Sequence, residues 1–180
     1  MKKIVIAGFG GQGVLSMGLM LAQSAMYMDY NTSWLPSYGP EMRGGTANVA
    51  VTYSRGEIAC PLISHPDFLV AFNAPSLDKF VSSLETGGTL LVNSSAVTKK
   101  PSRTDIKTVY VPVADLAAPI NPRGGNLIML GVILPLLKTI DRSAAEKAVR
   151  YVFEKKPNLI DSNLRCLDRG MEYAEKEILR

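Results

Sequence analysis

The sequence has few of the side chains that usually carry chemistry. Its 180 residues include two cysteines, Cys60 and Cys166, and a single histidine, His65. Two cysteines are too few for a four-cysteine zinc or iron–sulfur site within the chain. A Ser–His–Asp or Cys–His relay would have to use His65. We therefore expect no catalytic residue and no metal site in this chain, and we expect both thiols to be reduced and packed in the core.

Strong charge and long apolar runs are also missing. Twenty Lys and Arg residues against sixteen Asp and Glu residues give a net charge of +4, which is too small and too scattered to indicate nucleic-acid binding. The longest apolar run, Leu127 to Leu137, has about half of the ~20 residues that span a bilayer, and Pro135 interrupts it. Lys2 and Lys3 lead into a strand pattern, not into a signal peptide. These features predict a cytoplasmic protein with no membrane span and no nucleic-acid partner.

What the sequence does have is an alternation of strand and helix patterns. Hydrophobic residues make up 47% and charged residues 20%, as expected for one globular domain over residues 1–180. We predict strands near 2–7, 31–35, 46–53, 58–60, 68–72, 89–92 and 106–111, and helices near 15–26, 76–84, 124–138, 142–154 and 163–179. The alternation predicts an α/β fold with a mostly parallel sheet flanked by helices, and a β-hairpin insertion near residues 46–60.

A glycine-rich turn follows the first predicted strand. Residues 8–13 read Gly-Phe-Gly-Gly-Gln-Gly and fit G-x-G-x-x-G between a strand and a helix. Such glycines bring backbone N–H groups close to an anion at the positive end of the helix. A dinucleotide site also needs an acidic residue after the second strand, and residues 31–35 supply none. The turn is therefore a packing device, a site for another phosphate-bearing group, or a contact with a cofactor-bearing partner.

A second glycine-rich segment covers residues 38–45, Tyr-Gly-Pro-Glu-Met-Arg-Gly-Gly. Glu41 and Arg43 either form an exposed ion pair of little energy or present an anion and a cation to a ligand. Glycines on both sides allow a cofactor or another backbone to approach closely. The residues alone leave both interpretations open.

Three motifs together resemble a known family. They are G-F-G-G-Q-G at 8–13, S-Y-G-P-E-M-R-G-G-T at 37–46 and N-A-P-S-L-D-K-F at 73–80. In combination they resemble the gamma subunit of 2-oxoacid:ferredoxin oxidoreductases, and Gly125-Asn126 followed by Leu130-Gly131 fits the same pattern. The resemblance extends from about Lys3 to the last predicted helix. Its P-E-M-R-G-G-T segment is most similar to 2-oxoglutarate enzymes, then to branched-chain 2-oxoacid enzymes, with pyruvate enzymes third.

The resemblance implies a multi-subunit enzyme of anaerobic metabolism. Such an enzyme oxidatively decarboxylates a 2-oxoacid to acyl-CoA and CO2 and reduces ferredoxin. The implied partners are alpha and beta subunits, optionally a delta subunit, and ferredoxin as the electron acceptor. Thiamine diphosphate, Mg and iron–sulfur clusters would lie in the partner subunits. This chain would contact coenzyme A, bind no cofactor tightly by itself, and be inactive in isolation.

The resemblance also implies a set of binding residues. The first turn would form a backbone anion cradle or a subunit contact through Gly10, Gly11, Gln12 and Gly13. In the second segment, Tyr38 would present an aromatic face, Arg43 a cation oriented by Glu41, and Gly44 and Gly45 would allow close approach. At the start of a later helix, Asn126 would either cap the helix or contact the ligand. The turn at Arg123 is a further anion candidate. The alternative function is a stand-alone nucleotide-binding α/β protein that uses the turn at 8–13.

Overall fold

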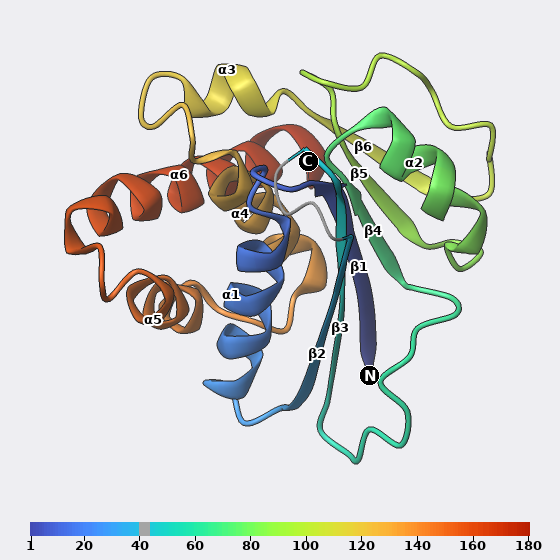
Figure 1. The fold of residues 1–180 in the computed structure, drawn as a ribbon, viewed down its shortest axis with the longest axis horizontal. Coiled ribbons are helices and arrows are strands. Elements are labelled where there is room, and N and C mark those ends of the chain that lie inside the picture. The colour runs from blue at the N-terminus through green and yellow to red at the C-terminus, as the bar shows by residue number, and fades with distance from the viewer. Residues whose placement is uncertain (40–43) are drawn as a thin grey trace.

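The computed structural model describes residues 1–39 and 44–180 (Figure 1). Its strands are β1 (Lys2–Phe9), β2 (Asn31–Tyr38), β3 (Thr46–Ser54), β4 (Phe68–Ala71), β5 (Thr89–Asn93) and β6 (Lys107–Val111). Its α-helices are α1 (Val14–Met26), α2 (Ala74–Phe80), α3 (Val113–Ala117), α4 (Gly125–Leu137), α5 (Arg142–Val152) and α6 (Ile160–Tyr173). Short 3-10 turns η1 (Val81–Ser83) and η2 (Pro157–Leu159) and a final π-helical turn η3 (Ala174–Ile178) complete it. The expected α/β class is confirmed.

The strands form one mixed sheet in the order β2-β3-β1-β4-β5-β6. Strands β1, β4, β5 and β6 are mutually parallel, whereas β3 runs antiparallel to both β1 and β2. The carboxyl ends of the parallel strands therefore face the same side of the molecule, at the top of Figure 1. We call this side the carboxyl end of the sheet. In open α/β sheets it is where ligands bind.

The hairpin lies earlier in the chain than the sequence predicted. Strand β3 pairs with β2, from Asn31 opposite Ser54 to Tyr38 opposite Ala47, and residues 58–60 form no strand. Pro36 does not end the second strand as expected, because β2 is at the edge of the sheet, where a missing backbone N–H costs no ladder bond. The predicted insertion at 46–60 is thus corrected to a hairpin of residues 31–54.

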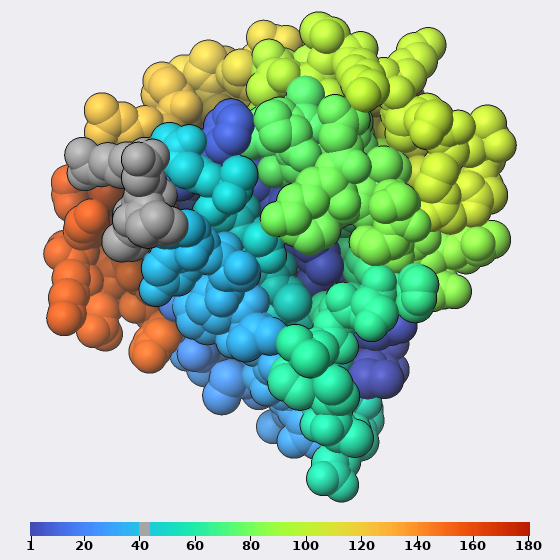
Figure 2. Space-filling model, turned by 45° about the vertical axis from the view of Figure 1, so that its right-hand side comes forward, coloured from blue at the N-terminus to red at the C-terminus, as the bar shows by residue number. Residues whose placement is uncertain are grey.

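Helices cover the two faces of the sheet unequally. Helices α1, α4, α5 and α6 lie on one face, where they bury the larger core with Ile4, Ile6 and Val49 (Figure 1). Helix α2 lies on the other face, over a smaller core that includes Leu69 and Leu90. Figure 2 shows residues of β2 and β3 at the surface beside α2. Strand alternation places the even-numbered residues of β3 on this less covered face.

Two glycines set the crossing of α4 and α6. A Cβ atom on Gly131 would lie 2.1 Å from the Leu167 carbonyl oxygen, and one on Gly170 would lie 2.2 Å from the Ile128 carbonyl oxygen. The two backbones therefore meet without an intervening side chain. Within the described residues, no helix combines the length and the apolar character needed to cross a bilayer.

Other differences from the sequence prediction are local. Helix α3 was missed because it has only five residues, and α6 begins three residues earlier than predicted. Helix α4 matches its predicted range within one residue, with Pro135 in its last turn. Cys166 is buried as expected, but Cys60 is exposed, because residues 55–67 form a surface loop without regular structure.

Candidate ligand site at the carboxyl end of the sheet

The glycine-rich turn joins the carboxyl end of β1 to the first turn of α1. Gly11 and Gly13 adopt positive φ angles of 100° and 75°, which side-chain-bearing residues rarely adopt. Gly13 is the N-cap of α1 and provides no side chain to bond the first N–H groups of the helix. Those N–H groups belong to Val14, Leu15 and Ser16, and no carbonyl within the helix can accept from them. The turn therefore presents unpaired donors at the positive end of a 13-residue helix.

The side chain of Gln12 stabilises this turn through two hydrogen bonds. Its Oε1 accepts a hydrogen bond from the Phe9 N–H at 2.7 Å and another from the Asn73 Nδ2 at 3.2 Å. A Cβ atom on Gly8 would lie 2.7 Å from the same oxygen, so this position accepts only glycine without rearrangement. The side chain of Gln12 is therefore a brace between the turn and the start of α2.

The two glycine-rich segments are tied together. The Gly10 N–H donates to the Gly45 carbonyl at 2.8 Å, and the Gly44 N–H donates to the Gly10 carbonyl at 3.4 Å. These bonds extend the pairing of β1 with β3 beyond Phe9. The structure therefore brings together the first turn and the end of the second segment, which the sequence separates by more than thirty residues.

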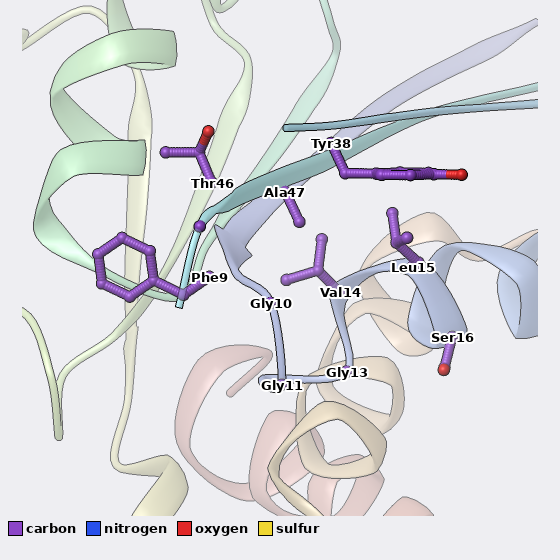
Figure 3. Close-up of a pocket in the computed structure, with 11 residues that line it drawn as sticks. Phe9, Gly10, Gly11, Gly13, Val14, Leu15, Ser16, Tyr38, Thr46 and Ala47 are labelled. Atoms are coloured by element: carbon purple, nitrogen blue, oxygen red, sulfur yellow. The ribbon is translucent and has the colours of Figure 1, made fainter. Parts of the chain in front are cut away.

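A pocket of about 320 Å³ opens beside this junction (Figure 3). Its walls come from the turn, the first residues of α1, the end of β2 and the start of β3. They are Phe9, Gly10, Gly11, Gly13, Val14, Leu15, Ser16, Tyr38, Gly45, Thr46 and Ala47. Tyr38 is 54% exposed and supplies the aromatic wall. The pocket combines an apolar lining with backbone donors, which is the usual character of a small-molecule site.

Some of the predicted site residues line this pocket, and others do not. Gly10, Gly11, Gly13, Tyr38 and Gly45 all line the pocket. Gln12 supports the turn from behind, as its hydrogen bonds require, and Gly44 contributes its bond to Gly10. Glu41 and Arg43 lie outside the described residues.

Asn126 is not the cap of helix α4. The helix begins at Gly125, its N-cap is Gly124, and Asn126 lies within the first turn. The buried Asn126 amide instead reaches toward α1, where its Nδ2 donates to the Gly13 carbonyl at 3.4 Å. The capping interpretation was wrong because the preceding glycines allow the helix to begin earlier than Asn126.

The sequence reasoning missed a group of buried amides around the same end of the sheet. Asn73 follows β4 and caps α2 by accepting from the Ser76 N–H at 2.9 Å. Asn93 ends β5 and donates through Nδ2 to the Phe72 carbonyl at 3.3 Å. Asn163, in the first turn of α6, accepts from the Asn121 Nδ2 at 3.2 Å. The sequence feature that could have revealed Asn73 and Asn93 is the asparagine at or just after the end of each of two neighbouring parallel strands.

The thiols and carboxylates of the described residues do not fit a metal cofactor. No group of three or more His, Cys, Asp or Glu side chains lies close enough together there to hold an ion. Burial raises the pKa of the Cys166 thiol, which disfavours the thiolate that ligates iron or zinc. The described residues therefore offer no fitting thiolate set for an iron–sulfur cluster.

These features define an α/β protein with a pocket, and hence a candidate ligand site, at a glycine-rich strand-to-helix turn. Comparison with known proteins identifies its family. The family described as pyruvate ferredoxin/flavodoxin oxidoreductase matches residues 3–173. The chain belongs to this family.

Individual relatives fall into two groups by length. The chain is 42% identical, over 98% of its length, to the ketoisovalerate oxidoreductase subunit VorA of Methanothermobacter thermautotrophicus, but it spans only 37% of that protein. It is 31% identical to the 2-oxoglutarate synthase subunit KorC of Methanocaldococcus jannaschii, with 97% of this chain and 95% of KorC covered. The region similar to this chain therefore makes up most of KorC but only part of the longer VorA.

A solved structure agrees with the fold. The gamma subunit of a keto/oxoacid ferredoxin oxidoreductase from Geobacter sulfurreducens superimposes with a TM-score of 0.81 at 30% identity. The match covers 97% of this chain and 99% of that subunit. The expected single α/β domain is thus the fold of a complete gamma subunit in this relative.

Proposed function

We propose that the chain is the gamma-type unit of a 2-oxoacid:ferredoxin oxidoreductase. The assembled enzyme would oxidatively decarboxylate a 2-oxoacid, transfer the acyl group to coenzyme A, release CO2 and reduce ferredoxin. The observation that carries the proposal is the 42% identity to a ketoisovalerate oxidoreductase subunit over 98% of this chain. The family match over residues 3–173 supports the same assignment.

In this proposal the chain shapes the approach of coenzyme A and the subunit interface. Unpaired N–H groups at the start of α1 attract phosphate oxygens, and Tyr38 gives a flat apolar surface beside them. Arg43 adds a cation from the neighbouring segment, with Glu41 as its orienting partner or a contact to another subunit. The chain thus supplies binding and positioning, and its partners supply the reacting groups.

Alpha and beta subunits, optionally with a delta subunit, would complete the enzyme in the cytoplasm. Thiamine diphosphate would supply carbanion stabilisation, and iron–sulfur clusters would carry the electrons to ferredoxin. We place these groups and Mg²⁺ in the partners, and for the iron–sulfur clusters the described residues support this because they offer no fitting thiolate set.

Two substrates are supported by different observations. The segment Pro40 to Thr46 is most similar to 2-oxoglutarate enzymes, which favours 2-oxoglutarate. The overall identity is higher to the ketoisovalerate subunit than to the 2-oxoglutarate subunit, 42% against 31%. Because overall identity samples far more residues than one loop, we propose a branched-chain 2-oxoacid as the substrate and 2-oxoglutarate as the second candidate.

The proposed role is tested in the reconstituted complex. Arg43→Ala should reduce CoA-dependent turnover and raise the KM for CoA without changing the melting temperature of the isolated chain. Arg165→Ala is the matched control, because Arg165 is an exposed arginine on the outer side of α6. Unchanged kinetics for Arg43→Ala would remove the assigned role of that residue.

The alternative function predicts a different result with the purified chain. A stand-alone nucleotide-binding protein would bind NAD or FAD saturably without any partner. A gamma-type unit would instead copurify with its alpha and beta subunits. Saturable NAD binding together with no copurifying subunit would favour the alternative.

A further inference from the structure

Strand β2 forms one edge of the sheet, so one side of its backbone has no strand to pair with. On the other side it pairs with β3, and just beyond its end the Gly39 N–H donates to the Thr46 carbonyl at 3.4 Å. Hydrogen-bonded pairs in an antiparallel ladder recur at every second residue, so the odd-numbered residues of β2 bond to β3. The even-numbered residues therefore direct their backbone groups to the open edge, where no bond from the rest of the described chain reaches them. They are Thr32, Trp34, Pro36 and Tyr38.

This edge has little protection against pairing with another chain. Edge strands are commonly protected by charged side chains, by proline, by a bulge or by being very short. Strand β2 has eight residues and no charged side chain. Its one proline, Pro36, removes a single outward N–H and keeps its carbonyl. The other three outward residues keep both backbone groups, so the strand remains able to accept a further strand.

Exposed apolar side chains gather beside this open edge (Figure 2). Of the ten large hydrophobic side chains that are exposed in the described residues, five lie between residues 26 and 38. Trp34 is 36% exposed and Leu35 is 39% exposed. Strand alternation places Trp34 on the face that carries α1 and Leu35 on the opposite face. The edge therefore offers an apolar side chain on each side of its free backbone groups.

The charge pattern favours a second copy of this chain as the occupant of the edge. Between Lys3 and Glu41 the sequence has one charged residue, Asp29, and neither α1 nor β2 has any. Each copy carries a net charge of +4, so two copies meet most favourably over a face without charge. A partner with a charged surface would lose hydration here without gaining an ion pair.

The geometry of β2 is also self-complementary. A two-fold axis perpendicular to the sheet makes two β2 strands antiparallel, and an interface between identical surfaces requires such symmetry. Pro36 selects the register, because it can accept but cannot donate. When Leu35 lies opposite Leu35 of the second copy, each Thr32–Tyr38 pair forms two hydrogen bonds and each Trp34–Pro36 pair forms one. This register gives six bonds in total, and the other in-phase registers within β2 give at most four.

We propose that the chain forms a two-fold dimer in which the β2 strands of two copies pair antiparallel, centred on Leu35. The two six-stranded sheets then become one continuous sheet. Leu35 contacts Leu35 of the second copy on one face, and Trp34 packs against Pro36 on the other. This inference goes beyond the proposed function, because it concerns the chain by itself and needs no 2-oxoacid chemistry.

The first test is the mass of the purified full chain in analytical ultracentrifugation. Pairing along one strand buries a small interface, so we expect a dissociation constant of about 1–100 μM. Across this concentration range, the 19.5 kDa monomer should convert to a species of twice that mass. A chain that stays monomeric throughout the range overturns the inference.

Variants at the edge locate the contact. Leu35→Lys places two like charges opposite each other and should weaken the dimer at least tenfold, by roughly 1.4 kcal/mol or more. Leu62→Lys is the matched control, because Leu62 is 70% exposed in the loop of residues 55–67 and is not on this edge. It makes the same exchange and should leave the dissociation constant unchanged. Equal effects of the two variants overturn the assignment of the contact to β2.

Cysteine cross-linking tests the register and does not depend on the lysine variants. The background is Cys60→Ser, because Cys60 is exposed whereas Cys166 is buried. In this background Leu35→Cys should form a disulfide dimer under mild oxidation, because directly opposite Cβ atoms in an antiparallel pair lie about 4.5–5.5 Å apart.

The matched control for cross-linking is Ser33→Cys on the same face of the same strand. Ser33 lies opposite Ser37 of the second copy in the proposed register. Ser33→Cys alone should therefore cross-link little, whereas a mixture of Ser33→Cys and Ser37→Cys chains should cross-link well. Equal cross-linking of Ser33→Cys and Leu35→Cys alone, or none in any combination, overturns the proposed pairing.

The assembled complex separates this inference from the proposed function. Cross-linking of Leu35→Cys to an alpha or beta subunit, and not to a second copy, overturns the dimer and assigns the edge to that subunit. A monomeric chain that supports 2-oxoacid-dependent turnover also overturns the dimer while leaving the proposed function intact. A dimeric chain in a complex without turnover supports the dimer and counts against the proposed function.

Discussion

The side-chain amide of Asn126 donates a hydrogen bond to the backbone carbonyl of Gly13, over 3.4 Å and across 113 residues of sequence. Asn126 lies in the first turn of α4 and Gly13 is the N-cap of α1, so this bond fixes the relative position of two helix N-termini at the carboxyl end of the sheet. Gly13 has no room for a side chain, because its Cβ would lie 2.6 Å from the Asn126 amide. The proposed ligand site depends on this close approach.

Substitution of the two positive-φ glycines should separate backbone strain from side-chain collision. Gly11→Ala places a Cβ in open space, so its only cost is the backbone strain of a φ near 100°. We expect this strain to lower the free energy of unfolding by about 1 kcal/mol. Gly13→Ala adds the collision with Asn126 and should cost about 3 kcal/mol. Urea denaturation of the two variants measures the difference. Equal losses would mean that Asn126 does not approach Gly13 as described.

The crossing of α4 and α6 predicts a loss of stability at a second glycine. In Gly131→Ala the new methyl group would lie 2.1 Å from the Leu167 carbonyl oxygen, so the two helices must separate. We expect a loss of about 3 kcal/mol or more, or a chain that does not fold. Gly56→Ala is the control, because nothing lies closer than the Ser54 Oγ at 4.0 Å, and it should change stability little. A Gly131→Ala variant as stable as the control would contradict this packing.

Stability at high pH should depend on Tyr53. Burial raises its pKa to about 12, although the Thr139 hydroxyl at 2.7 Å acts in the opposite direction. In the unfolded chain the pKa is about 10, so the unfolded state loses this proton first as the pH rises. The contribution is fully present below pH 10 and is lost between pH 10 and 12, by about 3 kcal/mol. Denaturation midpoints at a series of pH values measure this slope.

The control for that slope is Tyr53→Phe. The phenylalanine variant loses the bond to Thr139 and should be less stable at neutral pH. Its stability should nevertheless fall less steeply than that of the wild type above pH 10, because one buried proton no longer titrates. Parallel curves for the two proteins would assign the high-pH loss to other groups.

Much of the fold follows from local patterns in the sequence. Buried apolar runs identify β1, β4 and β5, and the glycines at 8–13 identify the turn between β1 and α1. The hairpin was misplaced because pairing between β2 and β3 is a long-range property, and Pro36 is tolerated only since β2 is at the sheet edge. Pro36 is compatible with an edge strand, but no local signal shows which strand pairs with β2.

The site was predictable only in part, for a similar reason. A glycine motif shows where a backbone turns, so Gly10, Gly11 and Gly13 could be named in advance. The role of Asn163 depends on α6 packing beside the turn before α4, which no spacing within α6 reveals. Asn126 was named, but its contact with Gly13 required the tertiary arrangement.

The most direct test of the proposed function is ferredoxin reduction by the complex assembled with and without this chain. With coenzyme A present, we predict turnover with 2-ketoisovalerate that exceeds turnover with 2-oxoglutarate or pyruvate and that is lost when the chain is omitted. The account is contradicted if the complex without the chain is equally active, or if the chain forms no complex with alpha and beta subunits.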